Sequence, residues 1–340
     1  MTDPSPAAPP SVRDRINKLL IIADPTLTPP LPSKISIEIN NGCNHFCYFC
    51  PNPTMARRRT VMAPELVLRV LGEAWQNGVR EVSFYSTGEP FLVAQLPRYI
   101  AAAKALGFSY VFLSTNGGKA TTARIEPTLD AGLDSLKFSI NAGTRESYAL
   151  VHGVDEFEQV MANVQMVADY RARTGRALRL VVSYVDTPLS RNDFGRLQER
   201  IGHLVDEIVR YPFMVIGTPL SRRTDAKGTE RPFIGYEDTN RREGWNVARL
   251  KLPCYQLWNY LNVTVEGHIS ACCADFNNDL IVGSLASMSL MDAWHSPEFQ
   301  KLRQMHVDRR IKGTLCHSCI AQKPFPYEPL NQHLTGAATR

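Results

Sequence analysis

The chain has 340 residues, of which 44% are hydrophobic and 21% are charged, and its formal net charge is +5. This composition is typical of a globular protein with a sizeable core, and so small an excess of positive charge gives no reason to expect nucleic acid as a partner. No run of about 18 apolar residues occurs, so we expect no membrane span and no membrane partner.

The N-terminus (residues 1–15) is rich in proline and has no apolar core. Residues 1–32 are predicted to be a disordered lead rather than a secretion signal. Without an export signal a cytoplasmic location is expected, and there the eight cysteines would stay reduced. Clustered thiols in that compartment typically bind metal or carry out redox chemistry.

Strands and helices alternate over residues 33–211. The apolar patterns predict strands at 33–40, 81–85, 109–114, 135–140, 178–185 and 207–211, separated by helices at 64–76, 96–106, 122–131, 156–171 and 193–204. Such alternation indicates βαβ units and a parallel sheet. Six strands are too few for a closed eight-stranded barrel. The pattern alone leaves a six-unit open barrel and a doubly wound sheet as alternatives, and in both the ligands bind at the carboxyl ends of the strands.

The regular pattern ends near residue 215. Residues 216–253 are polar, charged and rich in turn-forming residues, which is typical of a linker or a surface loop. Residues 254–340 have shorter elements and hold the other five cysteines. We therefore predict two units, an α/β domain at 33–215 and a small second domain at 254–340.

Three cysteines lie close together directly after the first strand, in the sequence CNHFCYFC that begins at Cys43 and continues with Cys47 and Cys50. A structural zinc site needs four ligands, and we expect His45 to face solvent rather than to supply the fourth. Three thiolates suit an iron–sulfur cluster with one iron left open for a substrate or cofactor. Zinc binding and chance clustering are the alternatives. The basic run at residues 57–59 is expected to be a solvated loop.

This spacing resembles that of the radical S-adenosylmethionine (SAM) superfamily, which also has an aromatic residue before the last cysteine, here Phe49. The sequences STGEP (residues 86–90), STNGG (114–118) and KFSIN (137–141) are similar to other motifs of that family and occur in the family's order near successive strands. One departure is Thr87, where the family usually has glycine. The resemblance covers roughly residues 33–215 and favours the open six-unit (βα) partial barrel.

The resemblance implies a chemistry and a set of ligands. In the family a 4Fe–4S cluster binds SAM through its open iron, an external one-electron reductant of the flavodoxin or ferredoxin type reduces the cluster, and SAM cleavage yields a 5′-deoxyadenosyl radical that takes a hydrogen atom from the substrate. By motif, Cys43, Cys47 and Cys50 hold the cluster. The implied SAM contacts are Gly88 and Glu89 to the amino group, Ser114, Thr115 or Asn116 to the carboxylate, Ser139 to the carboxylate or ribose, and Phe49 beside the adenine.

The remaining cysteines are Cys254, Cys272, Cys273, Cys316 and Cys319. Four thiolates would suit either a structural zinc ion or a second 4Fe–4S cluster. The region resembles the auxiliary-cluster domains of SPASM and twitch radical SAM proteins. Five cysteines are too few for two clusters, so the one-cluster twitch form is expected, with ligands Cys254, Cys272, Cys316 and Cys319. Cys273 would be the spare, although its neighbour could exchange roles with it.

The resemblance implies an oxidoreductase that dehydrogenates or epimerises a small sugar, aminocyclitol or nucleoside-like molecule. The auxiliary cluster would accept the second electron. Modification of a ribosomally made peptide is the alternative, less favoured because only residues 1–32 precede the first strand and no leader-binding domain is visible there. A non-enzymatic iron–sulfur protein for electron transfer or redox sensing and a zinc-stabilised binding module are further alternatives. No acid or base residue is identified by the sequence.

Overall fold

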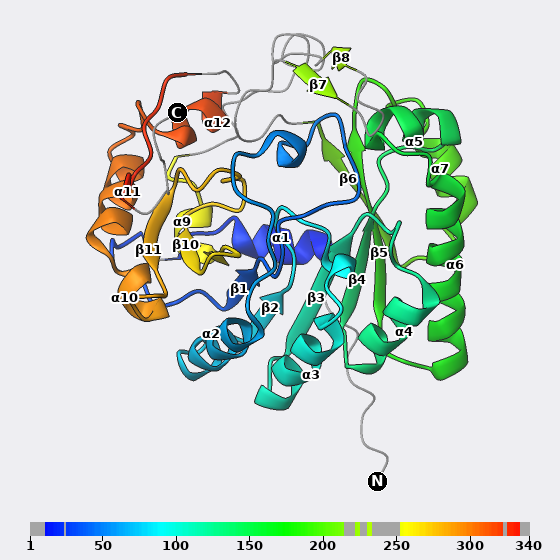
Figure 1. Cartoon of the computed structure of the whole chain (residues 1–340), viewed down its shortest axis with the longest axis horizontal. Coiled ribbons are helices and arrows are strands. Elements are labelled where there is room, and N and C mark those ends of the chain that lie inside the picture. The colour runs from blue at the N-terminus through cyan, green and yellow to red at the C-terminus, as the bar shows by residue number, and fades with distance from the viewer. Residues whose placement is uncertain are drawn as a thin grey trace.

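A computed structural model of the chain describes residues 11–23, 25–213, 222–224, 230–232, 252–321 and 325–333. Within these residues one mixed sheet has nine strands in the order β11-β10-β9-β1-β2-β3-β4-β5-β6, as Figure 1 shows. Strands β1 to β6 are parallel neighbours and form an open partial barrel. They are β1 (Lys34–Ile37), β2 (Glu81–Ser83), β3 (Tyr110–Thr115), β4 (Ser135–Ser139), β5 (Arg179–Asp186) and β6 (Glu207–Pro212). Each predicted strand of this region is therefore confirmed.

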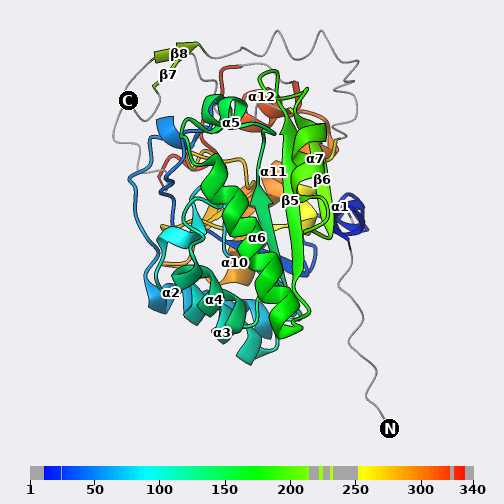
Figure 2. The ribbon, with the colours of Figure 1, turned by 90° about the vertical axis from the view of Figure 1, so that its right-hand side faces the viewer.

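The helices that connect these strands cover one face of the sheet, the outer face (Figure 2). They are α2 (Pro64–Gln76), α3 (Leu96–Leu106), α4 (Thr122–Asp130), α5 (Arg145–His152), α6 (Phe157–Thr174) and α7 (Phe194–Ile201). In α2 the buried residues Val67, Val70, Leu71 and Ala74 recur at the spacing of one helical face. Helix α5 was not predicted from the sequence. It begins at a capping box formed by Thr144 and ends at Gly153, which has the left-handed conformation.

The C-terminal unit continues the same sheet. Strand β9 (Leu261–Val263) pairs in parallel with β1, and β10 (His268–Ser270) and β11 (Ile281–Ser284) follow in antiparallel order. Three short helices complete the unit, together with the four-residue α9 (Gln256–Asn259): α10 (Leu290–Trp294), α11 (Pro297–Val307) and α12 (Leu315–Ala321). Of the predicted linker at 216–253, the structure describes residues 252–253 and the two strands β7 (Arg222–Thr224) and β8 (Glu230–Pro232), which pair with each other.

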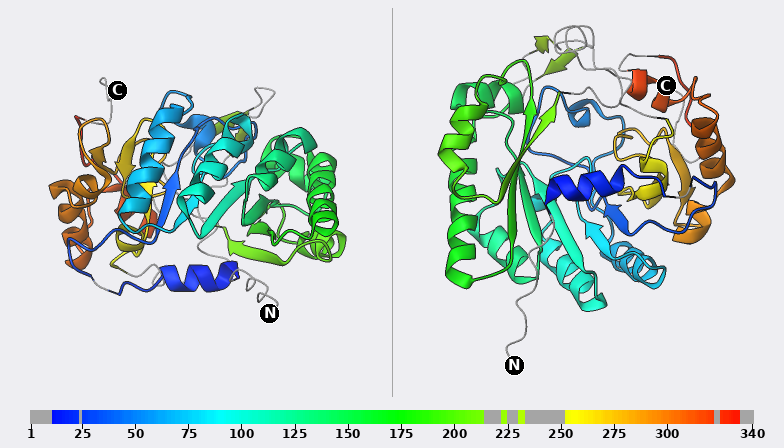
Figure 3. Two further views of the ribbon diagram at one scale, coloured as in Figure 1. Left: turned by 90° about the horizontal axis from the view of Figure 1, so that it is seen from below. Right: turned by 180° about the vertical axis from the view of Figure 1, so that it is seen from behind.

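The expectation of a disordered lead is wrong for the part of it that the structure describes. Residues Val12–Leu19 form helix α1, which lies on the face of the sheet opposite α2–α7 (Figure 3). The Val12 N–H donates to the Glu207 carboxylate of β6 at 2.9 Å, and the Asn259 amide of α9 donates to the Leu19 carbonyl at 2.7 Å. The helix thus bridges the two sides of the open barrel through contacts far away in sequence, which local composition does not reveal.

Residues 25–30 are also ordered by the C-terminal unit. The indoles of Trp258 and Trp294 donate to the carbonyls of Thr26 and Pro29, at 2.7 and 2.9 Å. The buried guanidinium of Arg303 donates to the Leu27 carbonyl at 2.8 Å. Proline-rich backbone keeps its carbonyl acceptors although it lacks N–H donors, so this segment is held by donors from other parts of the chain. Among the described residues, no helix is long and apolar enough to cross a membrane.

Candidate functional site

The three clustered cysteines lie on the loop that follows β1, at the carboxyl end of the sheet. All three thiols are partly buried. The His45 N–H points to the Cys43 Sγ at 3.4 Å and the Asn52 N–H to the Cys50 Sγ at 3.5 Å. Burial raises the pKa of the Cys43 thiol to about 12, and the Glu89 carboxylate adds to the shift. A thiol held in this way ionises readily only when bound metal supplies positive charge. The donor set and its N–H···S contacts therefore fit a metal–sulfur cluster.

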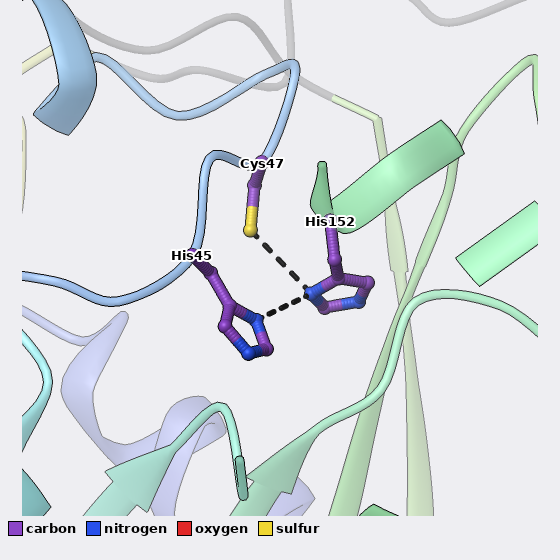
Figure 4. A group of neighbouring side chains, drawn as sticks. All are labelled: His45, Cys47 and His152. Carbon is purple, nitrogen blue, oxygen red and sulfur yellow. Dashed lines mark hydrogen bonds between the residues drawn. The ribbon is translucent and has the colours of Figure 1, made fainter. Parts of the chain in front are cut away.

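The third thiol, that of Cys47, lies beside two histidines (Figure 4). The His152 Nδ1 is 3.5 Å from the Cys47 Sγ and 3.3 Å from the His45 Nδ1, while the His45 Nε2 is 2.9 Å from the Glu156 carboxylate. The Asn141 N–H donates to the His152 Nε2 at 3.3 Å. This bond makes the His152 Nε2 an acceptor, so in the neutral ring the proton lies on Nδ1, within reach of both the His45 Nδ1 and the Cys47 sulfur.

This arrangement corrects the expectation that His45 faces solvent, because its ring is buried and only 2% of the residue is exposed. Burial and the neighbouring His45 hold the pKa of His152 well below its usual range, so His152 stays neutral. Nitrogen atoms of the two histidines and the Cys47 sulfur lie within 4.8 Å of one another, which is also compatible with a metal ion. His152 is a site residue that was not predicted from the sequence, because it belongs to α5, the helix that was also not predicted.

The STGEP segment supports the cysteine loop from the next strand. The Glu89 carboxylate accepts from the Thr115 hydroxyl at 2.7 Å and from the Asn116 N–H at 2.8 Å, and burial raises its pKa. Its side chain therefore holds the STNGG loop. The Glu89 N–H donates to the Gly42 carbonyl at 2.8 Å. Hydrogen bonds of Glu89 therefore link the cysteine loop, the STGEP segment and the STNGG loop at the carboxyl ends of the strands.

Gly88 is required by the closeness of two backbone segments. A Cβ atom at this position would lie 2.4 Å from the Asn40 carbonyl oxygen and 2.7 Å from that of Gly42. We expect Gly88→Ala to lower the stability by about 1–3 kcal/mol, because the cysteine loop must move. Gly72→Ala is the matched control, since nothing lies within 4 Å of its Cβ and alanine favours the α2 helix by about 0.5–1 kcal/mol. Thermal unfolding of the reconstituted variants measures both, and equal stability of the two would contradict the prediction.

The other predicted SAM contacts lie around the same loop. The Asn116 amide is 3.6 Å from the Cys43 sulfur and donates to the Asn44 side chain at 3.0 Å. Ser114 and Ser139 are partly buried at the ends of β3 and β4. The Phe49 ring packs edge-on against the rings of Tyr48 and Phe213, with centroids 5.7 and 6.2 Å apart. Their contacts with SAM stay predictions.

One residue of the basic run has a structural part that the sequence analysis did not foresee. Arg57 pairs with the Glu38 carboxylate and, at 2.6 Å, with that of Glu266, and only 5% of its side chain is exposed. Glu38 follows β1 and Glu266 lies between β9 and β10. The ion pairs therefore join the cysteine loop to the C-terminal unit, and the expectation of a solvated loop is wrong for Arg57.

A second group of thiols surrounds a cavity of about 40 Å³ in the C-terminal unit, lined by apolar residues, His306 and four cysteines, namely Cys254, Cys272, Cys316 and Cys319. Burial raises the pKa of Cys319 to about 12 and also raises those of Cys254 and Cys316. The His306 Nδ1 accepts from the Cys254 N–H at 3.2 Å. Four partly buried thiols around an apolar pocket fit a closed metal or iron–sulfur site.

Cys273 lies outside the lining of this cavity and is exposed, unlike Cys272. We expect Cys272→Ala to remove the metal of this site, because one of four ligands is lost, and Cys273→Ala to retain it. Iron content and the visible spectrum after anaerobic reconstitution measure the difference between these matched variants. Loss of metal in Cys273→Ala alone would exchange the two roles.

Comparisons with known proteins agree with this geometry. Residues 37–189 match the model of the radical SAM superfamily, and residues 254–320 match that of the SPASM iron–sulfur cluster-binding domain. A SAM-dependent 2-deoxy-scyllo-inosamine dehydrogenase of Niallia circulans is 21% identical over 84% of this chain and 92% of its own length. A probable GTP 3′,8-cyclase of Saccharolobus islandicus is 29% identical, but the match covers 40% of this chain and 43% of that protein.

Two solved structures illustrate the shared fold. BtrN in complex with AdoMet and 2-DOIA matches 82% of this chain and 88% of its own, with 19% identity and a TM-score of 0.51. SuiB of Streptococcus suis bound to SAM matches 86% of this chain and 72% of its own, with 16% identity and a TM-score of 0.63. The two domain matches coincide with the two groups of thiols. The chain therefore carries a radical SAM domain at residues 37–189, followed by an iron–sulfur cluster-binding domain of the SPASM type at residues 254–320.

Proposed function

We propose that the chain binds two 4Fe–4S clusters, one held by Cys43, Cys47 and Cys50 and the other by Cys254, Cys272, Cys316 and Cys319. When bound, the first cluster and SAM supply a one-electron reductive cleavage that generates a hydrogen-abstracting radical. Three cysteine ligands leave one iron of the first cluster open for SAM, whereas four close the second site. The Gly88 backbone and the loop that holds Asn116 border the first thiols and would bind the methionine end of SAM.

The reaction that we propose is dehydrogenation of a small hydroxylated molecule. Converting an alcohol to a carbonyl removes one hydrogen atom from carbon, one further electron and one proton. A closed four-thiol site on the same continuous sheet as the three-thiol loop suits the acceptance of that electron, and this observation carries the proposal. The inosamine dehydrogenase similarity supports it. An external reductant of the flavodoxin or ferredoxin type would supply the first electron.

Anaerobic incubation with SAM, dithionite and a library of sugars, cyclitols, nucleosides and peptides tests the proposal. We expect substrate-dependent 5′-deoxyadenosine with a sugar-like or nucleoside-like compound and an equimolar amount of a product two hydrogens lighter. A peptide as the only effective compound would favour the alternative of peptide modification, and an epimerised product of unchanged mass would exclude net dehydrogenation.

A further inference from the structure

Two lysines lie on the inner face of the sheet, the face that α1 covers. Lys34 begins β1 and is 7% exposed, and its ammonium nitrogen is 4.4 Å from the ring centroid of Phe112 and 4.5 Å from that of Tyr260. The Lys137 nitrogen, from β4, lies 5.8 Å from the rings of Tyr85 and Tyr211. The Tyr85 and Phe112 rings are 6.0 Å apart, so both lysines belong to one region lined by aromatic rings.

Neither lysine has a carboxylate within 4.0 Å in the part of the chain that the structure describes. The nearby acids already have arginine partners. Glu81 pairs with Arg15 of α1 at 2.5 Å, and Glu207 pairs with Arg179 at 3.0 Å. Burial lowers the pKa of Lys34 to about 7. Arg15 and Lys137 add to this shift, whereas Glu81 and the Cys273 thiol oppose it. Burial alone lowers the pKa of Lys137 to about 8.

Lys34 is buried and Lys137 is partly buried, and an ammonium group in such a place is costly to keep without a carboxylate or another strong anion beside it. Contacts with aromatic faces recover about 0.5–2 kcal/mol each and do not neutralise the charge. A ligand with an anionic group would satisfy both ammonium groups. Both ammonium groups lie on the inner face of the partial barrel, opposite helices α2–α7.

We propose that Lys34 and Lys137 bind an anionic group of the substrate, a carboxylate or a phosphate, and thereby select an acidic substrate. The inference rests on the proposed function and names its substrate class. Lys137 precedes Ser139 by two residues on the same strand, so the two side chains share a face at a spacing of about 7 Å. The anionic end would thus lie deeper in the barrel than the SAM motifs, with the reacting carbon toward the strand ends.

An acidic substrate would distinguish this chain from its inosamine dehydrogenase relative. An inosamine carries an amino group, which is protonated at neutral pH and would be repelled by two lysines. The similarity to that enzyme over most of the chain therefore does not imply that this chain acts on an inosamine. The contrast gives the proposal a direct test with ligands of matched size and different charge.

Binding is measured on the reconstituted protein with SAM, without reductant, by pulsed acetylation with acetic anhydride and mass spectrometry of the lysine peptides. The probes are myo-inositol 1-phosphate, glucuronate, neutral myo-inositol, cationic glucosamine and inorganic phosphate. We expect at least one anionic probe to slow the acetylation of Lys34 and Lys137 by about tenfold, the effect of 1.4 kcal/mol. Neutral and cationic probes should have no such effect, and exposed Lys301 should be unaffected throughout.

Variants separate charge from packing. Lys34→Met and Lys137→Met should each abolish the protection of the remaining lysine, whereas Lys137→Arg should keep the protection of Lys34 and Lys301→Met should change nothing. Protection by glucosamine or myo-inositol equal to that by the anions, or protection by none of the probes, would overturn the proposal. Because no turnover is needed, a negative result beside intact SAM cleavage would overturn the anionic class alone. Protection without dehydrogenation would count against the proposed reaction alone.

Discussion

Replacing Cys43, Cys47 and Cys50 together with alanine is expected to leave about half of the iron in the reconstituted protein, the four irons of one cluster, and to reduce SAM cleavage to background. The reason is that the remaining four thiols line a separate cavity, and a cluster held by four thiolates has no open iron to which SAM could bind. Iron analysis and 5′-deoxyadenosine formation with dithionite measure the two effects.

Cys273→Ala is the control for this triple variant, since it removes a thiol from neither predicted ligand set. It should keep full iron content and full SAM cleavage. Retention of all the iron by the triple variant would mean that the clustered cysteines are not ligands, and the assignment of the first site would be wrong.

Removing the second site has a different expected result. Cys316→Ala with Cys319→Ala should leave SAM cleavage by dithionite within a few-fold of normal, while formation of the dehydrogenated product falls to background. The physical reason is that the first site starts the reaction, whereas the second has four thiolates and serves only to accept an electron. Measuring 5′-deoxyadenosine and product separately reveals this uncoupling.

The control must distinguish an electron-transfer role from a structural one, because the four-thiol site lies between α9, the end of β10 and α12. Circular dichroism and thermal unfolding of the double variant establish whether it is folded. A folded double variant that lacks the second cluster and still makes product at the normal rate would show that the site only stabilises the C-terminal unit.

The fold of the first domain was predictable because its signals are local. Each parallel strand is a short apolar run between amphipathic helices, and Gly88 and Asn116 lie in motifs that follow directly after such runs. The cysteine spacing is also local, since Cys43, Cys47 and Cys50 share one loop. Chemistry that depends on neighbours in sequence could therefore be assigned before the structure.

The features that the sequence did not reveal depend on distant partners. Helix α1 is polar and is held by Glu207 and Asn259, which are far away in the chain. Strand β9 is only three residues long, and nothing local indicates that it pairs with β1. His45 is buried because α5 brings His152 beside it. Lys34 and Lys137 are ordinary strand residues until the curvature of the sheet brings them into one aromatic region.

The central claim is that the three-thiol site holds a cluster that binds SAM. It is tested most directly by electron paramagnetic resonance of the dithionite-reduced Cys316→Ala/Cys319→Ala variant, which should contain only that cluster. The account predicts that adding SAM changes the signal of the reduced cluster and that 5′-deoxyadenosine then accumulates. A cluster signal unaffected by SAM, with no 5′-deoxyadenosine, would contradict the account and favour an iron–sulfur protein that only carries electrons.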